Sequence, residues 1–162
     1  MRKLIALTLL TCLFIAAQAG SLQAQQQLPG DTAQAERDAL HLNTIGAFSA
    51  GFVLQSYGYI GVLADALSRG VYEADLVAPM LTETTSYLRN VNAQLQKYPA
   101  GSLTSADQKF ISSMMEIIKQ LIAEAEALAS FAKTKSKEDL EKYETARKTA
   151  WKNIEKTFGM KK

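Results

Sequence analysis

Four polar or ionisable residues interrupt otherwise apolar helical patterns and are the strongest candidates for chemistry in this chain. They are one tyrosine, two glutamates and one arginine: Tyr59, Glu83, Glu124 and Arg147. An unpaired charge inside a protein costs several kcal/mol, so we expect these side chains to meet and pair. We predict that Arg147 bridges Glu83 or Glu124, and that the Tyr59 hydroxyl completes a polar layer between helices.

Three interpretations of this layer remain open. Buried polar residues can fix the register between packed helices, which is a purely structural role. A second carboxylate is left over once Arg147 is paired, so the layer is alternatively a pocket for a small molecule or an ion. In the third interpretation Glu83 and Glu124 turn to solvent, because Thr84 and Ala125 can take the core positions instead.

The composition excludes most familiar catalytic and metal chemistry. The chain has one histidine, His41, and one cysteine, Cys12, so Cys/His metal clusters and Cys–His nucleophile pairs cannot be assembled from one copy. His41 with Met114 or Met160 would be a haem-ligand pair, but the C-x-x-C-H attachment motif is absent. The Glu-x-x-His pairs of di-iron bundles, nucleophile elbows and phosphate-binding loops are absent too. We therefore expect no cofactor, no metal and no enzyme activity.

The elements that must position these residues are helices, because apolar residues recur at helical spacing and no stretch alternates as a strand does. The predicted helices span about 32–69, 72–97, 105–133 and 137–158. Thr104 and Ser136 are predicted N-caps, and Gly70 and Gly159 are predicted stops. Short connections place sequential helices side by side in opposite directions. The predicted fold of residues 32–160 is all-α, an up-down-up-down antiparallel four-helix bundle.

Each predicted helix has one apolar seam that is expected to face the core. In the first two helices the seams are Ile45, Phe48, Phe52, Gln55, Tyr59, Val62 and Ala66, and Leu76, Met80, Glu83 or Thr84, Tyr87, Val91 and Leu95. In the last two they are Phe110, Met114, Ile117, Leu121, Glu124 or Ala125, Leu128 and Ala132, and Leu140, Tyr143, Arg147, Ala150 or Trp151, Ile154 and Phe158. The four candidate residues lie at similar distances from one end, about 13–17 Å at 1.5 Å per residue. They are therefore predicted to share one layer.

An uncharged stretch from Leu42 to Ala64 dominates the first predicted helix and contains four glycines. We expect a helix buried on most sides, with glycines that let a neighbour pack closely. A membrane span and a self-association face are the alternatives, since Ala47 and Gly51 form a small-xxx-small step. No basic cluster flanks the stretch, so a stable membrane span is not predicted.

The first 24 residues have the pattern of a cleaved secretory signal peptide. A basic start precedes an apolar run and small residues that suit cleavage after Ala19 or Ala24. The polar stretch 25–31 is predicted to be a disordered leader. Cleavage would remove the only cysteine and bring the formal charge from +2 to 0. We expect export to the periplasm or the extracellular medium, and a near-neutral chain that does not bind nucleic acid.

Taken together, these patterns predict an exported, non-enzymatic bundle that recognises a protein partner or forms a homodimer through its long first helix. The interface residues predicted on that helix are Phe48, Gly51, Phe52 and Tyr57. The alternative is a bundle that binds a small molecule or an ion at the layer formed by Tyr59, Glu83, Glu124 and Arg147.

Overall fold

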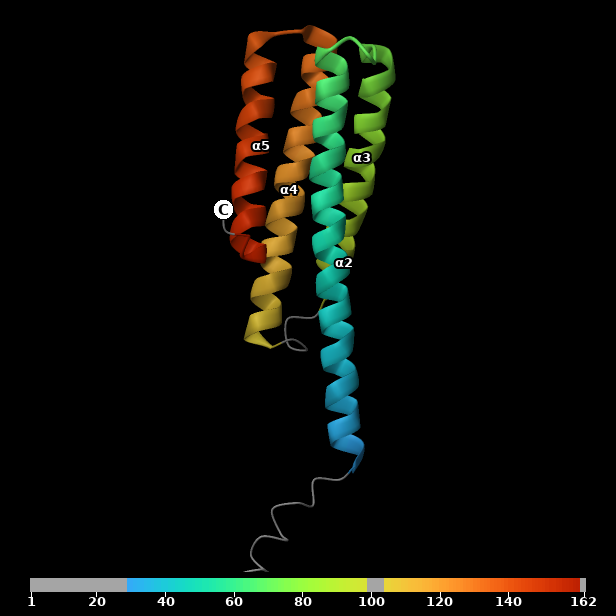
Figure 1. Cartoon of the computed structure of the whole chain (residues 1–162), viewed down its shortest axis with the longest axis vertical. Helices are drawn as coiled ribbons and strands as arrows, with labels where there is room; N and C mark the ends of the chain where they lie inside the picture. Colours follow the sequence, from blue (N-terminus) through green and yellow to red (C-terminus); the bar gives the residue numbers. More distant parts are fainter. Residues whose placement is uncertain (1–28, 99–103, 161–162) are drawn as a thin grey trace, which may run out of the picture. The chain divides into compact units, whose positions relative to one another are not determined.

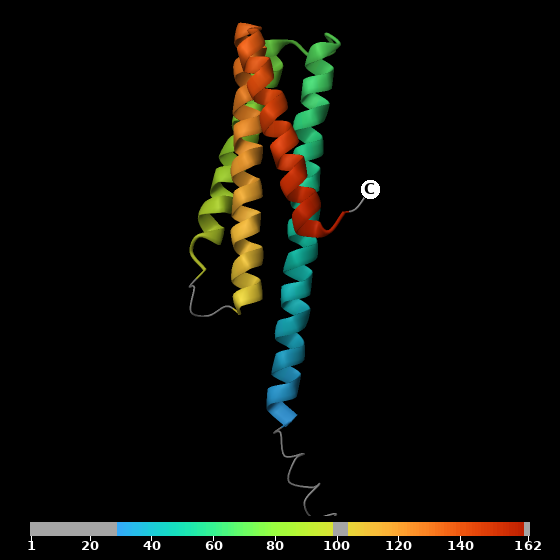
Figure 2. The ribbon, with the colours of Figure 1, turned by 90° about the vertical axis from the view of Figure 1, so that its left-hand side faces the viewer.

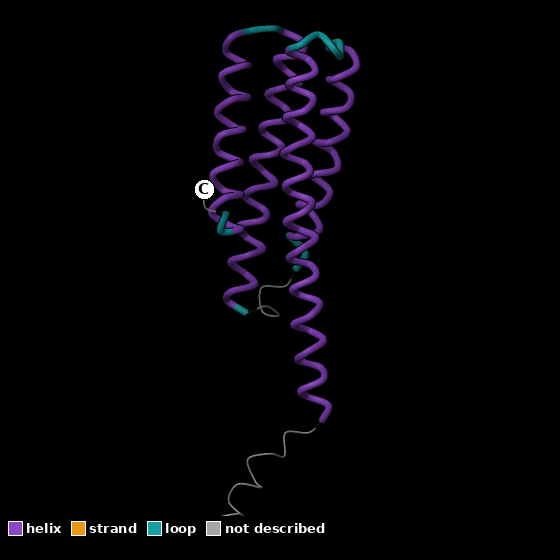
Figure 3. Tube along the Cα trace, in the orientation of Figure 1, coloured by secondary structure: helices purple, strands orange, loops and turns teal. Residues whose placement is uncertain are grey.

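The computed structural model describes residues 29–98 and 104–160 of the chain. These residues form four helices and no strand (Figures 1 and 3). The helices are α2 (Pro29–Ser68), α3 (Ala74–Leu95), α4 (Ser105–Thr134) and α5 (Lys137–Phe158). The predicted all-α class with four helices is therefore confirmed for this part of the chain. The predicted signal peptide, residues 1–24, lies outside the described residues.

Local capping signals explain where the last two helices begin and end. The hydroxyl oxygen of Thr104 accepts a hydrogen bond from the backbone N–H of Asp107, and that of Ser136 accepts one from Asp139. Both caps satisfy backbone donors that the first turn of a helix leaves free. Gly159 ends α5 with a φ of 65°, a left-handed conformation that glycine adopts without strain.

The start of α2 differs from the sequence prediction. The helix begins at Pro29, so residues 29–31 are helical and do not belong to a disordered leader. A proline suits the first position of a helix, because its fixed φ is already helical and its missing N–H would have no partner there. The remainder of the predicted leader, 25–28, lies outside the described residues.

The chain divides into two compact units, residues 1–45 and residues 46–162. In the first unit, every side chain described between positions 32 and 45 is exposed, Leu40 among them. In the second unit, α3 packs along α4 and α4 packs along α5 (Figure 2). The candidate site lies entirely within this second unit.

The core of the second unit is aliphatic. In α4 and α5 the buried residues include those that the predicted seams name: Met114, Ile117, Leu121, Leu128, Ala132, Tyr143, Ala150 and Ile154. In α2 and α3 the residues of the buried core cluster are different: Val53, Ile60, Leu63, Leu67, Val77, Leu81 and Leu88. Each of these seven residues comes directly after a residue of the predicted seam in the sequence.

The predicted seams of α2 and α3 are therefore wrong by one residue. Ile60 and Leu88 are fully buried, whereas the predicted Tyr59 and Tyr87 are 38% and 58% exposed. One residue turns a helix by about 100°, so the predicted stripes lie beside the core and not in it. The physical reason is composition: the predicted stripes contain Gln55 and Glu83, and burying such groups without partners is costly. The neighbouring stripe is aliphatic and takes the core position instead.

Candidate functional site

The structure separates the predicted polar layer into two pairs. Arg147 on α5 reaches Glu124 on α4, and its Nη1 donates a hydrogen bond of 2.6 Å to Glu124 Oε1. Tyr59 and Glu83 do not join them, because both lie in a separate groove between α2 and α3. The bridge between Arg147 and Glu124 is therefore present, while the contribution expected from Tyr59 is absent from this layer.

Arg147 connects three helices. Besides its bond to Glu124, its Nη1 donates to the backbone carbonyl oxygen of Tyr57 on α2 at 3.2 Å. The guanidinium carbon lies 4.0 Å from the centre of the Tyr57 ring, an arrangement that favours a cation–π interaction. Trp151 also packs against Tyr57, with ring centres 5.2 Å apart. Tyr57 thus takes the place in which Tyr59 was expected.

Glu124 is fully buried, and one of its oxygens is unsatisfied. Its Oε1 accepts the bond from Arg147, but its Oε2 has no hydrogen-bond partner among the described residues. Burial raises the pKa of Glu124 to about 7, although the hydrogen bond and positive charge of Arg147 act in the opposite direction. The carboxyl group therefore exchanges its proton close to neutral pH.

The absence of a side chain at Gly61 leaves room for the Arg147 side chain against α2. A Cβ atom at this position would lie 2.5 Å from Arg147 Nη2, closer than real Cβ atoms approach any neighbour. Neither Gly61 nor Tyr57 was predicted beside Arg147; Tyr57 was instead predicted at a partner interface. The two residues stand four positions apart and so share a helix face, which is a signal that the sequence contains.

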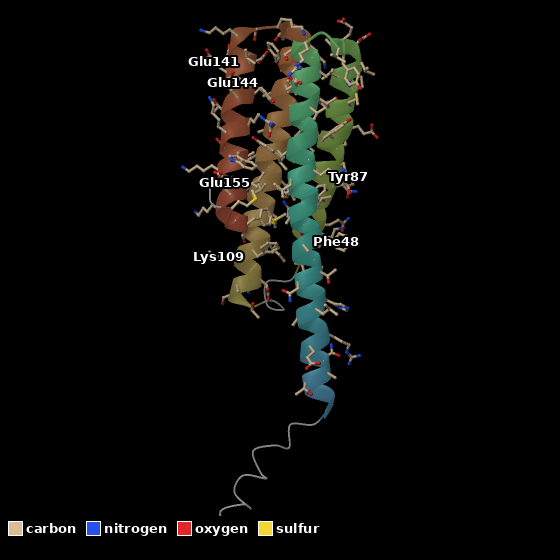
Figure 4. All side chains as sticks on the ribbon, in the orientation of Figure 1. Phe48, Tyr87, Lys109, Glu141, Glu144 and Glu155 are labelled. Carbon is tan, nitrogen blue, oxygen red and sulfur yellow. The ribbon has the colours of Figure 1, made fainter. Side chains whose placement is uncertain are left out.

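The groove between α2 and α3 has a volume of about 560 Å³. Its lining comes from two matching stripes with i, i+3, i+4, i+7 spacing: Phe52, Gln55, Ser56 and Tyr59 from α2, and Met80, Glu83, Thr84 and Tyr87 from α3. Phe52 and Tyr87 meet edge to face, with ring centres 5.6 Å apart. Figure 4 labels Tyr87 on α3. All of these residues except Ser56 belong to the predicted seams, so the middle parts of the two seams line an open groove and not the core.

The four predicted interface residues fall on two different parts of α2. Phe48 is 76% exposed (Figure 4), and a Cβ atom at Gly51 would meet nothing within 4 Å. Phe52 is half-buried at the groove, and Tyr57 is half-buried beneath Arg147. Of the four predicted interface residues, only Phe48 and Gly51 are therefore exposed on the outer face of α2.

The outer face of α2 is more exposed than the sequence analysis expected. Only 17% of its most apolar window is buried, so the prediction of a helix buried on most sides is wrong. By length and composition, the helix from Thr32 to Ser68, with a mean hydropathy of 1.3, is the one helix in the described chain that could cross a membrane. Signal sequences and core helices of soluble proteins share this length and composition, so these two properties do not establish a membrane span.

Within the described residues, no group of three or more histidine, cysteine, aspartate or glutamate side chains could hold a metal ion. His41, the residue considered for haem, is exposed. Comparison with protein-family models, curated proteins and solved structures gives no match.

Proposed function

We propose that this chain is an exported, non-enzymatic helical-bundle protein that recognises another protein chain through the outer face of α2. In the simplest case that chain is a second copy of itself. The observation that carries the proposal is an exposed, uncharged stripe on α2, formed by Phe48, Gly51, Gln55, Gly58 and Val62. We call this set the outer stripe.

The spacing of the outer stripe suits contact with another helix. Its members are separated alternately by three and four residues, the pattern by which coiled-coil helices meet. Phe48 and Val62 are 76% and 63% exposed, and no atom lies within 4 Å of a Cβ placed at Gly51 or Gly58. Glycines at these positions would let a second helix approach closely, while the two apolar side chains would be buried against it.

The proposal includes an up-down-up-down antiparallel arrangement of the helices in residues 46–160. Contacts between α4 and α5 support it, because they are nested around the connection between these helices. Ser130 bonds to Asp139 across nine positions, and Glu124 pairs with Arg147 across 23. Nested pairs of this kind are the pattern of antiparallel neighbours.

Export follows from the cleaved signal peptide predicted over residues 1–24. The apolar run there is short, and small residues precede the proposed cleavage points. A mature chain without cysteine has no disulfide, so packing of its aliphatic core must supply its stability.

Sedimentation velocity tests self-recognition. Purified protein is expected to form a dimer whose fraction rises with concentration, and Val62→Lys is expected to shift it to monomer because a charge would be buried at the contact. Val71→Lys is the matched control, since Val71 is 67% exposed but lies outside α2. A monomer at all concentrations up to the millimolar range would overturn the proposal, as would equal effects of the two substitutions. Flotation with lipid vesicles tests the membrane alternative.

The alternative function, binding of a small molecule or an ion, has its own support. The predicted layer residues Tyr59 and Glu83 lie together in the groove between α2 and α3, which has the volume of a small-ligand site. The chemistry of that groove is specific enough to name a class of ligand.

A further inference from the structure

The groove between α2 and α3 combines aromatic rings with a free carboxylate. Tyr59 and Tyr87 are 38% and 58% exposed, so ring surface is available to a ligand. The edge-to-face contact between Phe52 and Tyr87 fixes one wall of the groove. The side chain of Met80, a polarisable thioether, contributes apolar surface to the lining.

Glu83 is the single carboxylate that lines this groove. No lysine or arginine is among the lining residues, and Glu83 forms no salt bridge or hydrogen bond within the described parts of the chain. Some other acids of the same unit are paired, such as Asp65 with Arg69 and Glu126 with Arg89. The groove therefore presents one carboxylate without a salt bridge beside several ring faces. The same carboxylate also borders a neighbouring groove that contains Asp75 and Lys133.

Rings and a carboxylate attract the same class of ligand. The face of an aromatic ring carries partial negative charge and attracts cations, most strongly those that are weakly hydrated, such as alkylated ammonium ions. A carboxylate adds direct charge attraction. An inorganic cation would need several oxygen ligands, whereas this groove offers one carboxylate and mostly apolar surface. A ligand with a positive head and an apolar body fits both parts of the lining.

We propose that the groove formed by Phe52, Tyr59, Met80, Glu83 and Tyr87 binds a small organic ammonium ion. The positive head lies against Glu83 and the tyrosine rings, and the alkyl part contacts Met80 and Phe52. This site goes beyond the recognition of another chain through the outer stripe, since none of its five proposed contact residues belongs to that stripe, although Gln55 of the stripe also borders the groove. Failure of either proposal leaves the other standing.

Isothermal titration calorimetry with choline chloride tests the site. The matched probe is 3,3-dimethyl-1-butanol, in which a neutral carbon replaces the charged nitrogen at nearly the same shape. Saturable binding of choline that is clearly tighter than that of the neutral probe is expected. Equal binding of the two probes, or no saturable binding of choline, would overturn the proposal.

Variants separate the carboxylate from the rings. Glu83→Gln and Tyr87→Leu are each expected to weaken choline binding roughly 2–5-fold, as an exposed ion pair or cation–π contact does. The controls are Glu73→Gln and Tyr98→Leu, because both residues are exposed and neither lines the groove. All four positions are exposed, so circular dichroism is expected to show a folded protein in each case. A loss of binding that is equal in variants and controls would contradict the site.

The same positive head also occurs on methylated lysine side chains of proteins. An acetylated trimethyl-lysine amide carries that head on a peptide backbone and serves as the third probe. Binding of this probe no tighter than choline is expected for a site that takes a free ion. Markedly tighter binding of the amide would overturn the assignment to a free ion.

Discussion

Gly61 and Arg147 are in such close contact that the absence of a side chain at Gly61 is what lets the arginine reach Glu124. A Cβ atom at Gly61 would stand 2.5 Å from Nη2 and 2.9 Å from both Cζ and Nη1 of Arg147. The guanidinium cannot simply move aside, because Glu124 and the carbonyl of Tyr57 hold it. The buried ion pair between Arg147 and Glu124 therefore depends on glycine at position 61.

Substitution of this glycine should destabilise the fold. In Gly61→Ala the methyl group displaces the guanidinium from the buried carboxylate, and the expected loss is about 1–3 kcal/mol of the free energy of unfolding. Urea denaturation followed by circular dichroism measures it. The matched control is Gly46→Ala, also in α2, where a Cβ would meet nothing within 4 Å. There alanine should stabilise the helix by up to about 1 kcal/mol, and a similar loss in both variants would contradict the account.

Removal of the arginine should leave Glu124 as an unpaired acid in the core. Arg147→Leu is expected to lower the free energy of unfolding by about 2–4 kcal/mol at pH 8, where the carboxyl group is charged. The loss should be smaller at pH 5, where Glu124 carries its proton. A double-mutant cycle with Glu124→Leu measures the coupling between the two residues. Additive losses would show that the two side chains do not interact.

The stability of the protein should fall as pH rises from 4.5 to 7. The pKa of Glu124 is about 7 in the folded chain, against 4.5 for an ordinary glutamate. Between these values the folded chain binds more protons than the unfolded chain, so raising the pH favours unfolding, and the effect levels off above pH 7. At about 1.4 kcal/mol per pKa unit, the contribution is about 3–4 kcal/mol at most. Urea titrations from pH 5 to 8 measure it.

Glu124→Gln is the control for this pH dependence, because the amide keeps the shape and cannot titrate. Its stability should be nearly flat over the same range, and a slope equal to that of the unmodified protein would assign the effect to another group. Asp139 does not interfere. Hydrogen bonds from Thr134 and Ser130 lower its pKa from 3.8, so its own contribution changes only at more acidic pH.

The connection between α4 and α5 offers a local test of capping. Ser136→Ala removes the oxygen that accepts from the Asp139 N–H, and the expected loss is about 1 kcal/mol. Thermal unfolding by calorimetry measures it. Ser86→Ala, at an exposed position inside α3, should change the stability little. Equal effects at the two serines would contradict the capping role.

Features set by neighbouring residues could be predicted from the sequence, whereas the rotation of a helix about its axis could not. The caps at Thr104 and Ser136 depend on local hydrogen bonds, and the bond between Glu124 and Arg147 follows from spacing along helices whose seams were correctly assigned. In α2 the presence of a helix was predicted correctly, but the predicted core-facing stripe was displaced by one residue from the buried stripe. That displacement puts Ile60 in the core position predicted for Tyr59, and Tyr57, three residues before Ile60, contacts Arg147.

The same displacement explains the groove. The stripe that contains Gln55 in α2 and the stripe that contains Glu83 in α3 each have the same period as the aliphatic stripe beside them. Periodicity alone does not say which of two neighbouring stripes faces the core. The choice depends on which stripe can lose its water at lower cost, and this favours the one without polar groups. The exposure of the outer stripe was missed for a related reason, because an uncharged helix suits a buried site equally well.

The charged pair between α4 and α5 also restricts how far these helices can slide past each other. Their apolar seams repeat every seven residues, so a shift of α5 by seven positions would still bury aliphatic side chains. That slipped form would put the guanidinium of Arg147 beside Ile117 or Phe131 and would leave Glu124 facing Leu140 or Ile154. Both charges would then lie without a partner in an apolar environment. Slippage by one heptad is therefore destabilised at this one position, although the rest of the seam would tolerate it.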